Sequence, residues 1–229
     1  MVTFLSIREQ ARLRSDMVHS NFVSESELKL YVNSSVKELY DLLVSTYDDY
    51  YIKAPLEFTV TGTQDGYSLP TDFYKLRGLD RSIDSSGSAS SWWTVDNFNF
   101  AERNRYNYQA ALVRIFPLVK YRVFGSNLKL IPQTNAAGLY QLWYVPKCPE
   151  LVADSDEFDG ISGWEDYVVV DAAIKMLQKQ EDDVSVLAAQ KEALKMRIEA
   201  MAADRDAGTP ERITDARYNN GIYGGGGVW

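Results

Sequence analysis

Apolar and polar residues follow a helical period at both ends of this chain and a strand period in the middle. The longest helical signal covers residues 164–207, forty-four positions without Gly or Pro between Gly163 and Gly208. Because helices commonly end at a Gly, this stretch predicts one long helix or two collinear helices. A continuous helix of this length would extend about 66 Å, more than the chain's own core requires. We therefore expect part of it to contact another molecule.

The two halves of this stretch differ in pattern. Between Trp164 and Leu177, apolar residues cover nearly the whole circumference, which is typical of a helix buried among several neighbours. The second half carries a narrower stripe at spacings of three, four and seven, which predicts contact with one partner helix, of the same chain or of another subunit. This stripe consists of Val184, Leu187, Leu194, Ile198 and Met201, with Lys191 inside it. The acidic run at 181–183 predicts a bend or break, with an Asp as the cap of a second helix.

The N-terminal region, as far as residue 54, also lacks Gly and Pro and predicts two helices. A short helix with a weak apolar face is expected up to about Met17. The next signal is stronger, because Ser24 and Glu27 match a capping box and an apolar stripe of helical period follows them. We expect this second helix to run from about Ser24 to Tyr50.

The middle of the chain has the composition of a β region. Six of the seven prolines and eight of the fourteen glycines lie between residues 55 and 163. Short runs rich in β-branched and aromatic residues separate them, and such runs predict strands. We expect hairpins at 58–69 and 121–131, and further strands at 73–77, 92–95 and 139–145.

Together these patterns predict an α+β fold. A helical bundle built from both ends of the chain would carry a small antiparallel β domain inserted between its second and third helices. The expected divisions are the N-terminal helices (1–54), the β-rich insertion (55–162), the long C-terminal helix or helix pair (163–208) and an extended tail (209–229).

The tail has isolated apolar side chains in a segment that cannot build a core. It contains four consecutive glycines at 224–227. Because segments that stay in solvent are normally poor in aromatic residues, we interpret the apolar side chains as anchors that dock into grooves of another protein. A frayed tail that holds aromatics by chance is the alternative. The anchors are Ile213, Tyr218, Ile222, Tyr223 and Trp229.

Composition narrows the classes of partner. The net charge of −8 argues against a nucleic-acid surface built from Lys and Arg, although DNA can slide past an acidic wall. The fifteen tyrosines favour contact surfaces on which the tyrosine ring packs against a partner while its hydroxyl end stays exposed to water. No run approaches the roughly twenty apolar residues of a membrane helix, and the N-terminus lacks the pattern of a signal peptide. We expect a protein made in a reducing cytoplasm, without a membrane partner.

Residues typical of catalysis or metal binding are scarce. Cys148 and His19 are the single cysteine and the single histidine, which excludes an internal disulfide and a Cys-rich zinc site. The loop at 154–160 only partly resembles a calcium loop, since Phe158 stands at a ligand position and Asp159 at the position of the required Gly. No nucleophile elbow or phosphate loop occurs. We therefore predict no catalytic, cofactor-binding or metal-binding residue.

Two other functions stay open at this point. A pair of carboxylates could hydrolyse peptidoglycan, but the chain has 32 acidic residues and the sequence selects no pair among them. Trp92 and Trp93 could stack against a sugar in a carbohydrate-binding module, although packing or subunit contact is the more common role of such residues.

The order of several motifs resembles a known family, the head-to-tail adaptor (connector, or head-completion) proteins of tailed and especially short-tailed bacteriophages. The likeness spans about the whole chain. The motifs are Tyr67-Ser-Leu-Pro-Thr-Asp-Phe-Tyr-Lys-Leu-Arg-Gly78, Tyr140-Gln-Leu-Trp-Tyr-Val-Pro146, Gly163-Trp-Glu-Asp-Tyr-Val-Val-Val-Asp-Ala-Ala173, Glu181-Asp-Asp-Val-Ser-Val-Leu187 and Arg212-Ile-Thr-Asp-Ala-Arg-Tyr218.

The resemblance implies a structural role in the virion. It implies a homo-oligomeric ring, usually of twelve subunits, below the portal protein, with helices around a DNA channel. The C-terminal tail would bind the portal, and the next component would be a tail tube or nozzle protein. No catalytic residues come with the resemblance. A tail-tube or nozzle component is the alternative within the same structural class, and the role of the β insertion stays unassigned.

Overall fold

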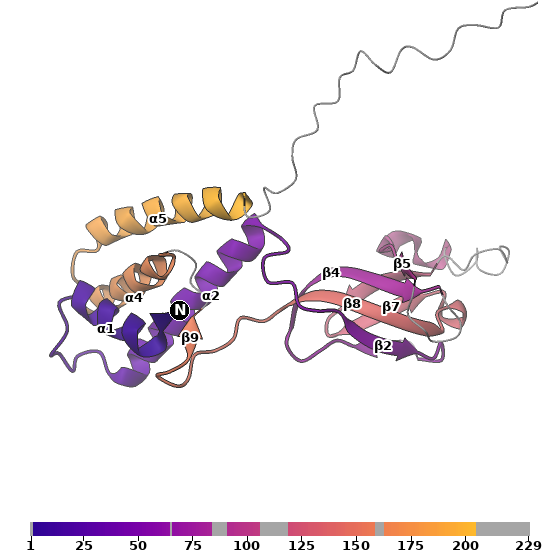
Figure 1. Cartoon of the computed structure of the whole chain (residues 1–229), viewed down its shortest axis with the longest axis horizontal. Coiled ribbons are helices and arrows are strands. Elements are labelled where there is room, and N and C mark those ends of the chain that lie inside the picture. The colour runs from indigo at the N-terminus through magenta and orange to yellow at the C-terminus, as the bar shows by residue number, and fades with distance from the viewer. Residues whose placement is uncertain (1, 65, 84–90, 106–118, 159–162, 205–229) are drawn as a thin grey trace, which may run out of the picture.

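The computed structural model describes residues 2–64, 66–83, 91–105, 119–158 and 163–204. Helices form one end of the molecule and small antiparallel sheets form the other, which confirms the α+β class (Figure 1). The predicted tail at 209–229 lies outside the described residues.

The first two helices begin where the sequence predicts them. Helix α1 (Phe4–Arg14) starts after Thr3, and α2 (Glu25–Thr46) starts after Ser24. The Ser24 hydroxyl accepts a hydrogen bond from the Glu27 amide, and the Glu27 carboxylate accepts one from the Ser24 amide. The predicted capping box is therefore confirmed, and α2 ends four residues earlier than expected.

The C-terminal helical stretch is divided into two helices that are not collinear. The prediction of one continuous helix or two collinear helices is therefore wrong. Helix α4 (Glu165–Gln180) ends at Glu181, whose φ of 60° lies in the left-handed region. The amide of Glu181 and the next amide donate to carbonyls in the last turn of α4, which is the hydrogen-bond pattern of a Schellman motif. Helix α5 (Ser185–Ala203) then folds back along α4 and α2 (Figure 1). The predicted break at 181–183 is confirmed.

The four helices enclose one hydrophobic core. Helix α4 lies in its centre, as its all-round apolar pattern predicted, and residues 167–174 of α4 are all buried. The side chains of Phe4, Leu28, Leu39, Met176 and Ile198 are among the largest that are fully buried in this core. Short strands β1 (Val2–Thr3) and β9 (Glu157–Phe158) pair beside it.

The β region contains two antiparallel sheets. The four-stranded sheet has the order β2 (Leu56–Val60), β8 (Gly138–Pro146), β4 (Phe73–Ser82) and β5 (Trp92–Thr94). The three-stranded sheet has the order β3 (Tyr67–Ser68), β7 (Asn127–Ile131) and β6 (Lys120–Phe124). Single turns η1 (Phe100–Glu102) and η2 (Gln133–Asn135) lie in the loops. Leu79, Leu128, Tyr140 and Leu142 are buried between these strands in a second core.

One predicted hairpin is confirmed and the other is wrong. Strands β6 and β7 pair as expected within 121–131. In the stretch 58–69, however, β2 pairs with β8 and β3 pairs with β7. This pairing stacks Phe58 on Tyr140 with ring centroids 5.8 Å apart and buries Val60. Burial against a distant strand therefore outweighs the local turn signal.

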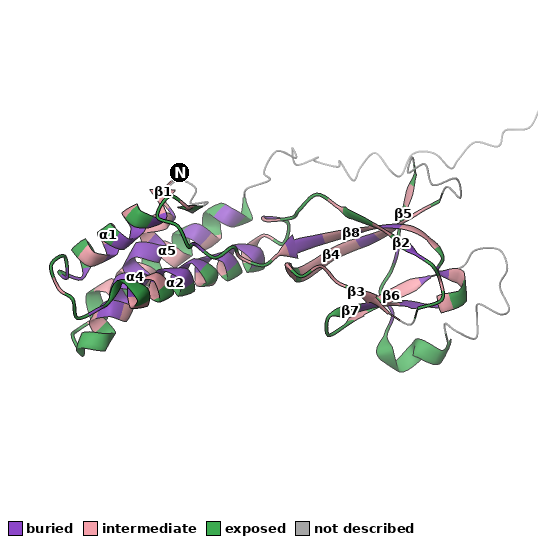
Figure 2. Cartoon of the chain, turned by 90° about the horizontal axis from the view of Figure 1, so that it is seen from below, coloured by how far each residue is buried: buried purple, intermediate pink, exposed green. Residues whose placement is uncertain are grey.

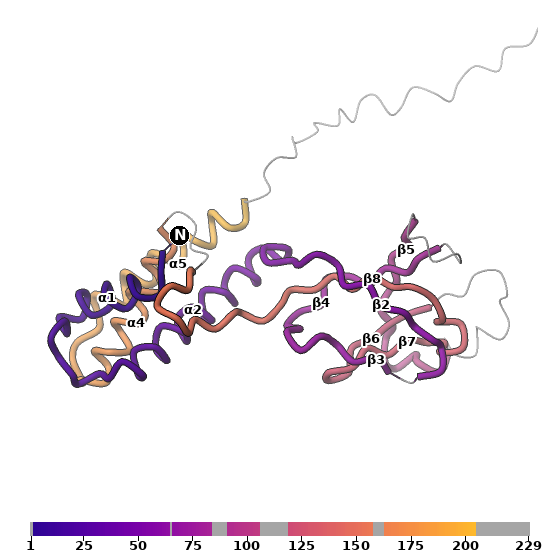
Figure 3. The backbone as a smooth tube through the Cα atoms, turned by 60° about the horizontal axis from the view of Figure 1, so that its bottom comes forward, coloured from indigo at the N-terminus to yellow at the C-terminus, as the bar shows by residue number. Residues whose placement is uncertain are grey.

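The two regions meet at the C-terminal end of α2 (Figures 2 and 3). The Tyr40 hydroxyl of α2 donates to the Pro146 carbonyl of β8 at 2.5 Å. Arg77 of β4 forms ion pairs with Asp48 at 2.8 Å and with Asp49 at 2.7 Å, just after α2. These contacts tie the central strands of the larger sheet directly to the helical bundle.

Candidate functional site

Helix α5 is the outermost helix of the bundle, and its inner face uses most of the stripe predicted for subunit contact (Figure 1). Val184 and Leu187 are half-buried, Leu194 packs at the edge of the core, and Ile198 is buried within it, whereas Met201 is exposed. The stripe packs inside the chain because α5 folds back on α4.

The outer face of α5 carries a second apolar row, which we call the outer row. Its six residues are spaced three and four apart in alternation, the spacing at which one helix packs along another. All six are exposed, Val186 by 77% and Met196 by 61%. The row consists of Val186, Ala189, Ala193, Met196, Ala200 and Ala203.

Sequence reasoning missed the outer row because four of its members are alanines. Leu and Ile on the opposite face give the stronger apolar signal, and Ala is a strong helix former at any position, so it says little about which face is covered. The heptad spacing itself was visible, and it becomes informative once the inner face is known to be occupied.

A charge network centred on the buried Asp171 connects α5 to the rest of the bundle. Asp171 of α4 is 2% exposed, and its carboxylate oxygens lie 2.7 Å from the Nζ of Lys175 and 2.7 Å from the Nζ of Lys191. Both lysines also contact Glu38 of α2, at 2.8 and 3.0 Å. Lys191, the polar residue inside the predicted stripe, therefore links α5 to α4 and α2.

The contacts of this network shift the pKa values of Asp171 and Lys191. Burial acts to raise the pKa of Asp171, but hydrogen bonds from Lys175 and Lys191 outweigh it and hold this pKa below its ordinary value. Burial acts to lower the pKa of Lys191, and hydrogen bonds to Asp171 and Glu38 raise it above its ordinary value. Asp171 and Lys191 are therefore both ionised at neutral pH, and their ion pair links α5 to α4.

The acidic loop at 154–160 is used for packing within its described part. Asp154 forms an ion pair with Arg8 of α1. The Asp156 carboxylate accepts hydrogen bonds from the amides of Val152 and Ala153, which lower its pKa. Across the residues that the structure describes, no group of three or more His, Cys, Asp or Glu side chains is placed to hold a metal ion.

The single histidine and the single cysteine have different surroundings. His19 is exposed between α1 and α2, whereas Cys148 is half-buried after β8. Burial raises the pKa of the Cys148 thiol to about 11, so at neutral pH this thiol is protonated and a weak nucleophile.

Cys148 is therefore expected to react slowly with thiol reagents. At pH 8 an ordinary cysteine with a pKa of about 8.5 is partly thiolate, whereas a pKa of about 11 leaves only a trace. We expect its labelling by a maleimide to be at least about tenfold slower in the folded protein than in urea. Equal rates in the two conditions would show that the thiol is not shielded.

Trp92 and Trp93 do not form one sugar-stacking platform. They are neighbours in β5, and successive side chains of a strand point to opposite faces of its sheet. Trp93 is 60% exposed and Trp92 is half-buried. In this arrangement the Trp92 ring packs partly against the protein and the Trp93 ring faces solvent.

The predicted anchors Ile213, Tyr218, Ile222, Tyr223 and Trp229 lie outside the described residues. Helix α5, which precedes them, ends at Ala203. Among the helices that the structure describes, none combines the length and apolar character needed to cross a bilayer.

Comparison with known proteins agrees with a structural role. No curated protein matches the sequence. The family described as SU10 adaptor protein matches residues 2–216, which include all the described helices and strands. The match thus covers both the helical and the β region and nearly the whole chain, and the chain belongs to this family of phage adaptor proteins.

Proposed function

We propose that the chain forms a ring of twelve copies between the portal and the tail of a short-tailed bacteriophage. DNA passes through the channel of this ring without sequence-specific binding, and a tail tube or nozzle protein follows on the far side. The ring has no enzymatic activity and requires no cofactor or metal. Membership of the adaptor family supports the role of a structural component of the virion neck. The ring, the DNA channel and the portal contact are our extension of that role.

The outer row of α5 is the observation that carries the proposal. An apolar row with heptad spacing on the outermost helix is a surface that a second helix can cover. In a closed ring every contact joins two different faces of the subunit. We therefore propose that the outer row of one copy packs against the helical region of the next.

The elongated arrangement of the chain suits a connector between two components. The helical region and the β region lie end to end and present separate surfaces (Figure 2). In the proposed ring the helical regions contact each other, and the β regions reach the next component. The net charge of −8 suits a conduit, because acidic walls repel phosphate and do not retain DNA.

Truncation after Gly208 tests the proposed portal contact. The described helices end at Ala203, so we expect the shortened chain to keep its helical content and its unfolding midpoint. Loss of Ile213, Tyr218, Ile222, Tyr223 and Trp229 should abolish binding to the portal, measured by co-sedimentation with purified portal rings. Portal binding that survives this truncation would remove the tail from the mechanism.

The mass of the assembled particle tests the ring. Native mass spectrometry of the chain mixed with a candidate portal reports the number of copies and the partner together, and we expect twelve copies on one portal. A chain that stays monomeric with and without the portal would contradict the proposal. Cell-wall hydrolysis by the purified chain, abolished by one carboxylate substitution, would favour the peptidoglycan hydrolase instead.

A further inference from the structure

The helical region and the β region have separate hydrophobic cores. Among the described residues, the buried apolar side chains of the helical region form one cluster and those of the two sheets form another. A third, small cluster of Tyr40, Val44 and Val145 lies between them. The Tyr40 hydroxyl also donates to the Pro146 carbonyl. We call these four residues the pivot, because the two regions share buried apolar surface there.

Two β-bulges in β4 aim side chains at the C-terminal end of α2. The pairing of β4 with β8 skips one residue of β4 at two places, at Tyr74 and at Arg77. Bulges redirect side chains out of the regular alternation of a strand. The Tyr74 hydroxyl donates to the Asp41 carboxylate at 2.8 Å, and Arg77 lies 2.8 Å from Asp48 and 2.7 Å from Asp49. Both redirected side chains therefore connect the β region to the helical region.

Lys75 adds a second cation to this contact, with its Nζ 2.6 Å from the Asp48 carboxylate. Helix α2 has no basic residue in its last turn, so the cations that offset its negative end come from β4. Hydrogen bonds from Lys75 and Arg77 lower the pKa of Asp48, which is therefore ionised at neutral pH. The residues of this contact, which we call the polar seam, are Asp41, Asp48, Asp49, Tyr74, Lys75 and Arg77.

The polar seam and the pivot depend on different forces. The side chains of the seam are partly exposed, Asp48 by 52% and Lys75 by 42%. Exposed ion pairs of this kind contribute little each, and salt screens them. The pivot and the two cores depend on the burial of apolar surface, which salt does not screen. Salt can therefore release the seam while both regions stay folded.

We propose that the polar seam sets the orientation of the β region, and that the β region turns about the pivot as a rigid body when the seam is released. The chain crosses between the two regions at residues 47–55 and 147–156, and these segments bend during the turn. A binding partner that competes for Lys75 and Arg77 releases the seam in the same way as salt.

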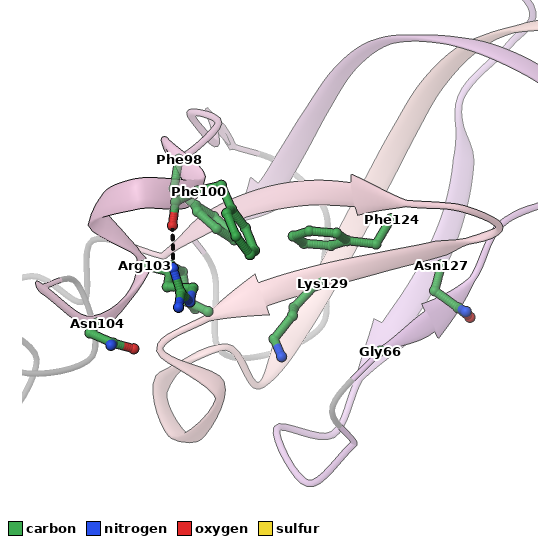
Figure 4. A pocket seen from close by; sticks show the side chains of 9 residues that line it. Gly66, Phe98, Phe100, Arg103, Asn104, Phe124, Asn127 and Lys129 are labelled. Carbon is green, nitrogen blue, oxygen red and sulfur yellow. Dashed lines mark hydrogen bonds between the residues drawn. The ribbon is translucent and has the colours of Figure 1, made fainter.

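The orientation of the β region determines where its exposed features point. Trp93 of β5 is 60% exposed. On the same region, a pocket of about 650 Å³ lies between η1 and the β6–β7 hairpin, with Phe100 and Phe124 in its wall (Figure 4). These features turn together, because one core joins both sheets. The polar seam therefore determines which surface the β region presents to another component.

Distances between spin labels test the proposal in the full chain. Glu9→Cys in the helical region is combined with Ser126→Cys or with Thr63→Cys in the β region, and Cys148→Ala leaves only the introduced cysteines to label. The labelled chain is mixed with excess unlabelled chain, so that pulsed electron paramagnetic resonance measures distances within one copy whether or not rings form. We expect one narrow distance distribution for each pair at about 50 mM NaCl and a distribution at least about twofold broader at about 1 M NaCl.

Arg77→Gln should broaden both distributions even at low salt, because it removes the ion pairs with Asp48 and Asp49. Lys75→Gln should broaden them to a smaller extent, since it removes one ion pair. The matched control is Arg105→Gln, which removes an exposed ion pair with Glu102 inside the β region and should leave both distributions unchanged.

A label pair at Glu9 and Glu192, both in the helical region, should keep its distance in every condition. The proposal is wrong if either Arg77→Gln or high salt leaves both distributions between the regions unchanged, or if Arg105→Gln broadens them as much as Arg77→Gln does. Broadening of the pair within the helical region would also overturn it, because the change would then be local unfolding and not a turn of the β region. None of these outcomes depends on whether the chain forms a ring.

Discussion

Replacing Asp171 with Ala is expected to lower the free energy of unfolding by about 1–3 kcal/mol, because it removes the buried carboxylate that two partly buried ammonium groups share. Asp171 is 2% exposed and lies 2.7 Å from both Lys175 and Lys191. Removing the buried member of an ion network costs stability, since the remaining charges stay partly desolvated without their partner. Glu38 at the edge of the network compensates only in part.

Urea denaturation followed by circular dichroism measures this change. The matched control is Glu192→Ala on α5, where the carboxylate is exposed and lies 3.7 Å from Lys195. An exposed pair of this kind contributes about 0–0.5 kcal/mol. In the double variant Asp171→Ala, Lys191→Met, we expect part of the stability to return, because one unpaired charge is removed. Equal effects of Asp171→Ala and Glu192→Ala would show that the network does not hold α5.

The same network predicts how stability depends on pH. The folded pKa of Asp171 is lower than that of an unfolded Asp, about 3.9, so the folded state binds fewer protons there. The contribution of Asp171 to the free energy of unfolding is therefore complete above about pH 4. This contribution is lost as the pH falls through the lower pKa that Asp171 has in the folded state. Stability of the Asp171→Ala variant should fall less steeply in this acidic range than that of the unchanged chain.

Local signals account for the helices that the sequence predicted correctly. The capping box at Ser24 and Glu27 involves residues three apart, and the break after Gln180 occurs where the apolar pattern changes. Such signals require no knowledge of the rest of the fold. The α+β class follows from them, because the change from helical to strand period is also local.

Non-local pairing explains the errors. Val60 is buried because β2 lies beside β8, nearly eighty residues further along the chain, and no turn signal reports that pairing. Similarly, Lys191 interrupts the apolar stripe because it pairs with Asp171 of α4 and Glu38 of α2, which are distant in sequence. The sequence therefore predicted subunit contact for a face of α5 most of which packs within the chain, because the sequence could not show that α5 folds back.

Replacing Ala193 with Arg is expected to abolish ring assembly while the subunit stays folded. Ala193 lies in the middle of the outer row, with Ala189 and Met196 on adjacent turns, and all three are exposed in the isolated chain. A small side chain at such a position lets another helix approach closely, and a long charged one separates the two helices and buries a charge. The expected product is a monomer at concentrations at which the unchanged chain forms rings, measured by mass photometry.

Ala188→Arg is the matched control, since it makes the same substitution at an exposed position of α5 outside the outer row. We expect this variant to form rings as the unchanged chain does, and both variants to keep the same unfolding midpoint, because neither position is buried in the subunit. Loss of rings in both variants would assign the contact to α5 as a whole and not to the outer row. Rings that persist with Arg at position 193 would exclude the outer row as a subunit contact. The next candidates would then be exposed apolar side chains elsewhere on the helical region, such as Leu13 and Leu30.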